Sequence, residues 1–203
     1  VNDEKEFYHC FATSEHGNIF DFVMKTQNLK FGEAVKYLAN LAGMRPYTFS
    51  KQDEEREKKW QEYCSIYNQY VQFYHEEILK NEQVSIARDY LKKRNLSKEE
   101  VKKFKIGYVE KNSNFFEKLE NEFDQKVLIE SGLFYLDEKK NIYVERFRDR
   151  IIFPINNISG QPIGLGGRTI QENNYLAKYI NSPETPFFKK GSNLYNLDLA
   201  RKL

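Results

Sequence analysis

The densest group of arginines in the sequence is RFRDR at residues 146–150. On an extended strand alternate side chains share one face, so its three arginines would form a positive stripe, with Phe147 pointing the other way. Arginine suits phosphate because its guanidinium is planar, permanently charged and able to donate two parallel hydrogen bonds. The alternative is a surface ladder in which Glu145 and Asp149 neutralise part of the stripe.

Three glycines precede another arginine, in the order Gly164, Gly166, Gly167 and Arg168. Their spacing does not fit a dinucleotide-binding fingerprint, and no helix is expected to follow them. A strand with adjacent glycines permits close approach of a ligand or of another backbone. Packing against the rest of the protein explains them equally well.

The segment KYINSPETP, residues 178–186, combines a cation, an aromatic ring and an amide within four residues, followed by two prolines. Single-stranded nucleic acid requires such groups, because cations meet its phosphates and flat rings stack on its bases. Lys189 and Lys190 add positive charge nearby. The segment therefore favours a nucleic-acid partner.

The overall composition is that of an ordinary globular protein, with 203 residues, 40% hydrophobic and 31% charged. Residues 139–203 hold 11 Lys and Arg against 5 Asp and Glu, whereas residues 1–138 hold 21 against 25. An anionic partner is therefore expected in the last third. Two cysteines exclude a disulfide framework. No apolar run approaches a membrane span, and no signal pattern begins the chain, so we expect a cytoplasmic protein without a membrane partner.

These residues must be positioned by the secondary-structure elements of the chain. The expected order along the sequence is helices first and strands later, which predicts an α+β protein. Capping signatures place helix starts at Asn18, with Asp21 as its partner, at Ser97, with Glu100, and at Asn114, with Glu117. A stretch without periodicity at 44–56 reads as a linker. The expected helices are 19–24, 31–42, 57–80, 85–93, one from 97 and one from 114, and the expected strands are 142–144, 151–155 and 162–170.

The long helix at 57–80 has apolar and aromatic residues over a wide arc, from Trp60 to Ile78. Such a face could be the core of the domain, which is the interpretation we favour. The alternative function is a non-catalytic interaction module that docks a partner protein through this aromatic helix. The two differ in whether the face is buried.

The motifs together resemble a known family. The stretches RFRDRIIFPI, IGLGGR and KYINSPETPFFKKGSNLYNL, in that order, are similar to the polymerase core of DnaG-type bacterial DNA primases. The stretch YLKKRNLSKEEVKKFKIGYV resembles the helical segment just upstream in that family. The N-terminal residues VNDEKEFYHCF, HGNIFDFV and LKFGEAVKYLANLAGM resemble the second half of its zinc-binding module.

The resemblance implies a DNA-directed RNA polymerase, a nucleotidyltransferase that copies single-stranded DNA into short RNA primers for replication. It implies a zinc-module remnant at 1–43, a linker at 44–56 and, at 57–203, the template-binding subdomain of the polymerase core, helical first and then a basic part with a mixed or antiparallel sheet. The family's catalytic acids, with Mg or Mn, lie in a TOPRIM subdomain expected to begin after Leu203. The chain alone is therefore expected to be inactive, and the replicative helicase is expected to bind regions outside it.

The resemblance also implies roles for individual residues. Residues at matching motif positions would bind the DNA template by neutralising its charge: Arg94, Arg146, Arg148, Arg168, Lys178 and Lys190. Tyr179 and Asn181 would reach the phosphate or sugar of a nucleoside triphosphate. Cations alone predict no base-specific readout.

The zinc-binding module departs from the family pattern. Its second ligand pair, spaced CxxC, is Cys10-Phe11-Ala12-Thr13 here, and threonine is a poor zinc ligand. His16 could replace the missing ligand if the turn folds back. The alternative, which we favour, is that zinc binding is lost. Cys64 is expected to be an ordinary core residue.

Overall fold

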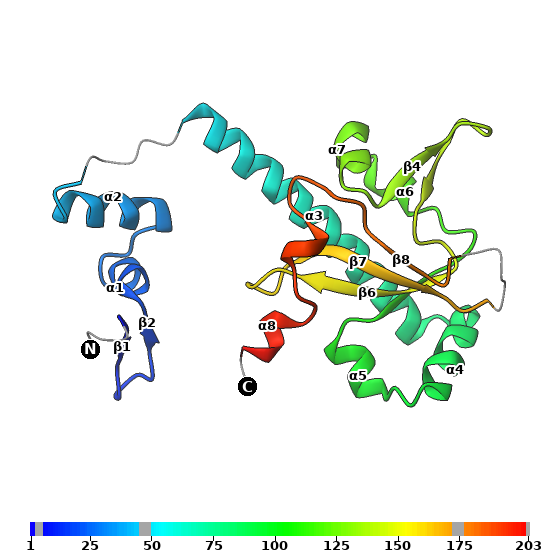
Figure 1. The fold of residues 1–203 in the computed structure, drawn as a ribbon, viewed down its shortest axis with the longest axis horizontal. Coiled ribbons are helices and arrows are strands. Elements are labelled where there is room, and N and C mark those ends of the chain that lie inside the picture. Colours follow the sequence, from blue (N-terminus) through cyan, green and yellow to red (C-terminus); the bar gives the residue numbers. More distant parts are fainter. Residues whose placement is uncertain (3–5, 45–49, 172–176, 202–203) are drawn as a thin grey trace. The chain divides into compact units, whose positions relative to one another are not determined.

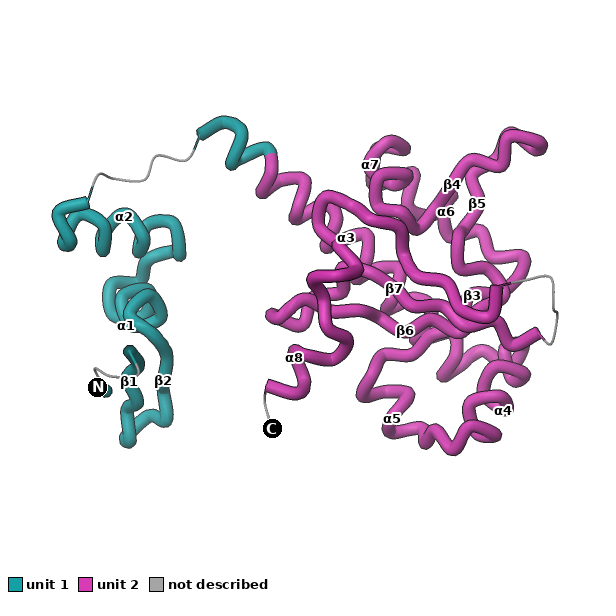
Figure 2. The backbone as a smooth tube through the Cα atoms, viewed as in Figure 1, with its two compact units in different colours: residues 1–55 teal, residues 56–203 magenta. Residues whose placement is uncertain are grey.

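A computed structural model describes residues 1–2, 6–44, 50–171 and 177–201 of the chain (Figure 1). The chain divides into two compact units, Val1–Glu55 and Arg56–Leu203 (Figure 2). Each unit is described by itself below. No helix within the described ranges is long and apolar enough to span a membrane.

The first unit is a short hairpin followed by two helices. Strand β1 (Tyr8–His9) pairs antiparallel with β2 (His16–Gly17), and helices α1 (Ile19–Thr26) and α2 (Phe31–Leu41) follow. The capping box predicted at the start of α1 is confirmed. The Asn18 side-chain oxygen accepts from the Asp21 backbone N–H at 3.1 Å, and the Asp21 carboxylate accepts from the Asn18 backbone N–H at 2.9 Å.

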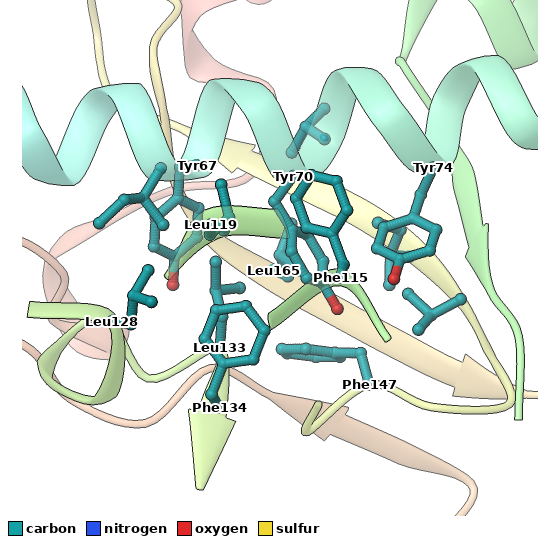
Figure 3. Close-up of a cluster of buried hydrophobic side chains, with 14 of the residues drawn as sticks. Tyr67, Tyr70, Tyr74, Phe115, Leu119, Leu128, Leu133, Phe134, Phe147 and Leu165 are labelled. Carbon is teal, nitrogen blue, oxygen red and sulfur yellow. The ribbon is translucent and has the colours of Figure 1, made fainter. Parts of the chain in front are cut away.

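The second unit is built on the long helix α3 (Lys51–Lys80). It begins inside the predicted linker, so the prediction of irregular structure up to residue 56 is wrong, and residues 45–49 of that linker lie outside the described residues. The predicted aromatic side of α3 is confirmed as core. Figure 3 shows Tyr67, Tyr70 and Tyr74 pointing from this helix into a buried cluster that includes Phe134.

Burial of this face argues against docking of a partner through it. Tyr67 and Tyr70 expose 0% of their surface. Tyr63, on the same helix, is also bonded within the core, because its hydroxyl donates a hydrogen bond to the Ile163 carbonyl oxygen at 2.7 Å. The aromatic helix therefore stabilises the second unit, and an interaction module built on it is not favoured.

An antiparallel sheet with the order β3-β6-β7-β8 lies beneath α3. Its strands are β3 (Gly107–Val109), β6 (Arg150–Asn156), β7 (Pro162–Thr169) and β8 (Tyr179–Asn181). Because side chains alternate between faces, Val109, Ile152 and Leu165 share the face that packs in the α3 cluster. The predicted α+β class and antiparallel sheet are confirmed.

The opposite face of the sheet meets two shorter helices, α4 (Ser85–Lys93) and α5 (Lys98–Lys103). They bury Leu91 and Val101 against Tyr108 and Ile151 of that face. The predicted capping box of Ser97 with Glu100 is confirmed at the start of α5. A helix does begin after Asn114, but the capping box predicted there is wrong, because the Asn114 side chain makes no cap hydrogen bond. The remaining elements of the unit are η1 (Glu82–Val84), α6 (Phe115–Leu119), α7 (Gln125–Glu130), the hairpin of β4 (Phe134–Asp137) and β5 (Ile142–Glu145), η2 (Lys190–Ser192) and α8 (Leu197–Ala200).

Candidate nucleic-acid interface

The RFRDR segment is not a strand, so the predicted arginine stripe is wrong. Residues 146–149 form a turn between β5 and β6, and only Arg150 belongs to a strand. Asp149 adopts a left-handed backbone with φ of 58°, which breaks strand alternation. Its backbone N–H donates to the Val109 carbonyl at 2.8 Å, and its carboxylate accepts from the Tyr108 hydroxyl at 2.8 Å.

The three arginines of this turn have different environments. Arg146 donates through Nε to the Gly132 carbonyl at 2.9 Å, and its guanidinium lies 5.5 Å from the centre of the Tyr135 ring. Arg150 is buried and donates to the Ala177 carbonyl at 2.9 Å, so it connects β6 to the segment before β8. Arg148 is half-buried. Arg146 and Arg148 therefore remain candidates for phosphate, whereas Arg150 is structural.

The surface-ladder alternative for this segment is also wrong. Glu145 exposes only 2% of its surface and accepts from the Tyr74 hydroxyl at 2.6 Å and from the Phe115 N–H at 2.9 Å. Asp149 is bonded to Tyr108, as described above. Both acids are thus held by neutral donors, and neither forms an ion pair with an arginine of the turn within the described residues.

A second group of predicted residues is brought together on the sheet face that α4 meets. Arg168 of β7 and Tyr179 of β8 are directly paired across the strands, and the Arg168 guanidinium donates to the Tyr179 hydroxyl at 2.6 Å. The Arg168 guanidinium lies 5.1 Å from the ring centres of both Tyr179 and Tyr90. Arg94 lies 5.4 Å from the Tyr90 ring. These four residues, Arg94, Tyr90, Arg168 and Tyr179, are called the stacked cluster below.

The stacked cluster holds two guanidinium groups without neutralising them. Within the described ranges, no acidic side chain forms a salt bridge with Arg94 or Arg168. Tyrosine rings attract a cation through their π faces, by about 0.5–1 kcal/mol at an exposed site, and leave its charge intact. A carboxylate partner would instead cancel that charge. The cluster is therefore suited to bind an anion such as a phosphate diester.

Two atoms of the stacked cluster are buried without a hydrogen-bond partner among the described residues, namely the Tyr90 hydroxyl and the Arg168 Nε. A buried polar group without a partner costs about 1–3 kcal/mol, and in folded proteins such groups concentrate at functional sites. Tyr90 was missed as a site residue by the sequence analysis. Its local signal is its spacing of four residues from Arg94, the residue that caps the C-terminus of α4, since this spacing brings the two side chains to the same side of the helix.

The other predicted residues surround this cluster to different degrees. Lys178 is exposed and adjoins Tyr179, and Asn181 is exposed at the far end of β8. Lys190 is exposed in η2, where its backbone N–H donates to a Glu184 carboxylate oxygen at 2.9 Å. Arg94, Arg168 and Tyr179 thus lie together in the stacked cluster, whereas Lys178 precedes Tyr179 in the chain and, by strand alternation, falls on the other face of the sheet. Arg146 belongs to the separate turn after β5.

The predicted zinc ligands do not form a metal site. Within the described residues, no group of three or more His, Cys, Asp and Glu side chains could hold a metal ion. The Cys10 thiol is instead hydrogen-bonded by the Thr13 side chain and by the backbone of Thr13 and Ala12, which lowers its pKa. His16 pairs with His9 across the hairpin, with ring centres 6.0 Å apart. The residues present do not fit a zinc site.

We expect Cys10 to be alkylated by iodoacetamide at pH 8 at least about tenfold faster than Cys64, because thiolate fraction and exposure set the rate. Cys10 is half-exposed and its pKa is lowered, whereas burial raises the pKa of the Cys64 thiol to about 11. Mass spectrometry of peptides from the native chain measures both rates, with Cys10→Ser as the control. If added zinc protected Cys10, the metal-free interpretation would be wrong.

Comparison with family models finds two matches along the chain. Residues 73–201 match the model described as the N-terminal domain of the DNA primase catalytic core. Residues 1–56 match the CHC2 zinc finger of DnaG. The first match contains every member of the stacked cluster and also the turn at 146–149.

Curated relatives extend the match over the whole chain. It is 40% identical to a DNA primase of Buchnera aphidicola, over 97% of this chain and 34% of that protein. It is 39% identical to a DNA primase of Salmonella typhimurium, over 100% of this chain and 35% of that protein. The chain therefore spans about a third of the length of these relatives.

Solved structures show the same fold. A DnaG primase catalytic domain bound to single-stranded DNA matches with a TM-score of 0.65 at 31% identity, over 72% of this chain and 45% of the other. An Aquifex aeolicus primase with zinc-binding and RNA polymerase domains matches with a TM-score of 0.59 at 29% identity, over 98% and 46%.

Proposed function

Because this chain belongs to the DnaG family of bacterial DNA primases, we propose that its second unit holds the single-stranded DNA template of an enzyme that synthesises RNA primers for replication. The observation that carries the proposal is the stacked cluster. Its two guanidinium groups have no acidic partner within the described residues, and the exposed Lys178 directly precedes Tyr179 in the chain. A solved relative of the same fold is bound to single-stranded DNA.

The proposed roles follow from the chemistry of each side chain. Arg94, Arg168 and Lys178 would neutralise consecutive template phosphates, and the Tyr179 ring, 60% exposed, offers a surface on which a base can stack. These groups meet phosphate and ring faces, so the site would accept many template sequences.

Further contacts would extend the template path beyond the cluster. Arg146 and Arg148 would bind phosphate from the turn after β5, and Lys190 from η2. Tyr179 and Asn181 would also meet an incoming nucleoside triphosphate. All of these contacts position and neutralise charge; none supplies a catalytic group.

The proposed domain organisation is a remnant of the zinc-binding module at 1–43, a linker at 44–56 and the template-binding subdomain at 57–203. The catalytic carboxylates, with Mg or Mn, would belong to a TOPRIM subdomain of the whole enzyme, which works in the cytoplasm. The replicative helicase would contact further regions of that enzyme. Residues 57–203 would then contribute template binding and no catalysis on their own.

The test is fluorescence anisotropy of a labelled single-stranded oligonucleotide titrated with the chain over a salt series. About four neutralised phosphates predict that log affinity falls against log salt with a slope near −3. An oligonucleotide analogue with an uncharged backbone is the control, and it should bind weakly with little salt dependence. Equal binding of both probes, or no binding at low salt, would contradict template binding by this unit.

A further inference from the structure

Two of the three glycines in β7 are explained by packing. A side chain at Gly164 would meet the ring of Phe188, with the nearest atom 2.9 Å from its Cβ. A side chain at Gly167 would meet the ring of Phe147 at 2.5 Å. Real Cβ atoms essentially never approach other atoms this closely, so a side chain at either position would force the neighbouring ring to shift, and packing accounts for both glycines.

Gly166 lies between them and has no such explanation. The nearest atoms to a Cβ at this position are the Asn181 side-chain oxygen at 3.5 Å and the Phe153 carbonyl oxygen at 3.9 Å, so alanine would fit. The ladder between β6 and β7 is regular here, because its irregularity lies at Ile155 and Asn156. Glycine within a strand weakens the strand, and where no bulge is present it often marks close approach of a ligand or of another backbone.

The surroundings of Gly166 show which ligand the bare backbone suits. Gly166 pairs with Asn181 of β8, and it shares its face of the sheet with Arg168, two residues along β7. The Asn181 side chain is exposed and makes no hydrogen bond within the described residues, so its amide can both donate and accept. These three features match the parts of one nucleotide. The flat backbone suits a ring, the free Asn181 amide suits a polar edge, and the unneutralised Arg168 guanidinium suits a phosphate.

We propose that the backbone at Gly166 is the floor of a shelf for a single nucleotide unit, and that this residue must lack a side chain for the nucleotide to bind. The sugar or base lies flat against β7, the Asn181 amide bonds to its polar edge, and Arg168 meets its phosphate. The inference rests on the proposed function and adds a residue to it that carries no functional group. The nucleotide comes from the template strand or from a free nucleoside triphosphate, which share this chemistry.

The test compares Gly166→Ala with Gly167→Ala in the whole chain. We expect Gly166→Ala to leave the midpoint of thermal unfolding unlowered, since its Cβ makes only ordinary contacts. Its affinity for the labelled oligonucleotide should fall by about tenfold, with an unchanged salt slope because no charge is removed. Gly167→Ala should lower the unfolding midpoint, because its Cβ collides with Phe147.

The outcomes separate this inference from the proposed function. A loss of affinity for the oligonucleotide assigns the shelf to the template, and a loss only for ATP with Mg assigns it to the incoming nucleotide. If Gly166→Ala bound both probes like the unsubstituted chain, the shelf would be refuted and template binding would stand. If the unsubstituted chain bound neither probe, the proposed function would fail, and the shelf with it.

Discussion

Replacing both Arg168 and Lys178 by alanine is expected to weaken binding of single-stranded DNA by at least about a hundredfold. A hydrogen bond to a charged group contributes roughly 1.5–3 kcal/mol, and the double variant removes two of the cations proposed to bind template phosphates. The slope of log affinity against log salt should also become shallower by about 1.4, since each phosphate contact to a single strand contributes about 0.7. Anisotropy titrations from low to moderate salt measure both quantities.

The matched control is Lys58→Ala with Lys59→Ala. It removes the same charge from the same unit, at exposed positions near the start of α3, whose core-facing side covers the other face of the sheet. We expect this control to change the affinity little. Arg168→Lys should give an intermediate loss, because lysine keeps the charge and lacks the planar group that stacks between Tyr90 and Tyr179. Equal losses in the two alanine pairs would show that net charge alone determines binding.

Features defined within a few residues were predicted from the sequence. The capping boxes at Asn18 and Ser97 each join residues three apart, so the local pattern contains the whole interaction. The buried side of α3 follows from the helical spacing of its aromatic residues. The order of helices and strands was sufficient for the fold class.

The failed predictions depend on contacts between distant residues. Alternating arginines in RFRDR imitate a strand, but Tyr108 holds Asp149 in a left-handed conformation from 41 residues away. The stacked cluster likewise joins Tyr90 of α4 to Arg168 of β7, which no local pattern relates.

The start of α3 within a charged segment was missed for another reason. Its first turns have no apolar face, and exposed helix of this kind gives no periodic signal.

Phe147 explains why the turn that carries Arg146 and Arg148 is fixed, and Phe147→Ala is expected to destabilise the second unit by about 3–5 kcal/mol. Its ring is fully buried in the α3 cluster (Figure 3). A Cβ at Gly167 would lie 2.5 Å from that ring. Urea unfolding followed by tryptophan fluorescence measures the loss. Trp60 is the only tryptophan of the chain, and it packs on Phe187 within this unit, so its emission reports the unit selectively.

A double-mutant cycle of Phe147→Leu with Gly167→Ala tests whether the ring and the glycine act as a pair. Gly167→Ala alone should cost about 1–3 kcal/mol, because its Cβ would lie 2.5 Å from the Phe147 ring. In the leucine background the collision is relieved, so the same substitution should cost less, with a coupling of at least about 0.5 kcal/mol. Additive losses would mean that another neighbour, such as the Arg150 side chain at 3.3 Å, keeps position 167 as glycine.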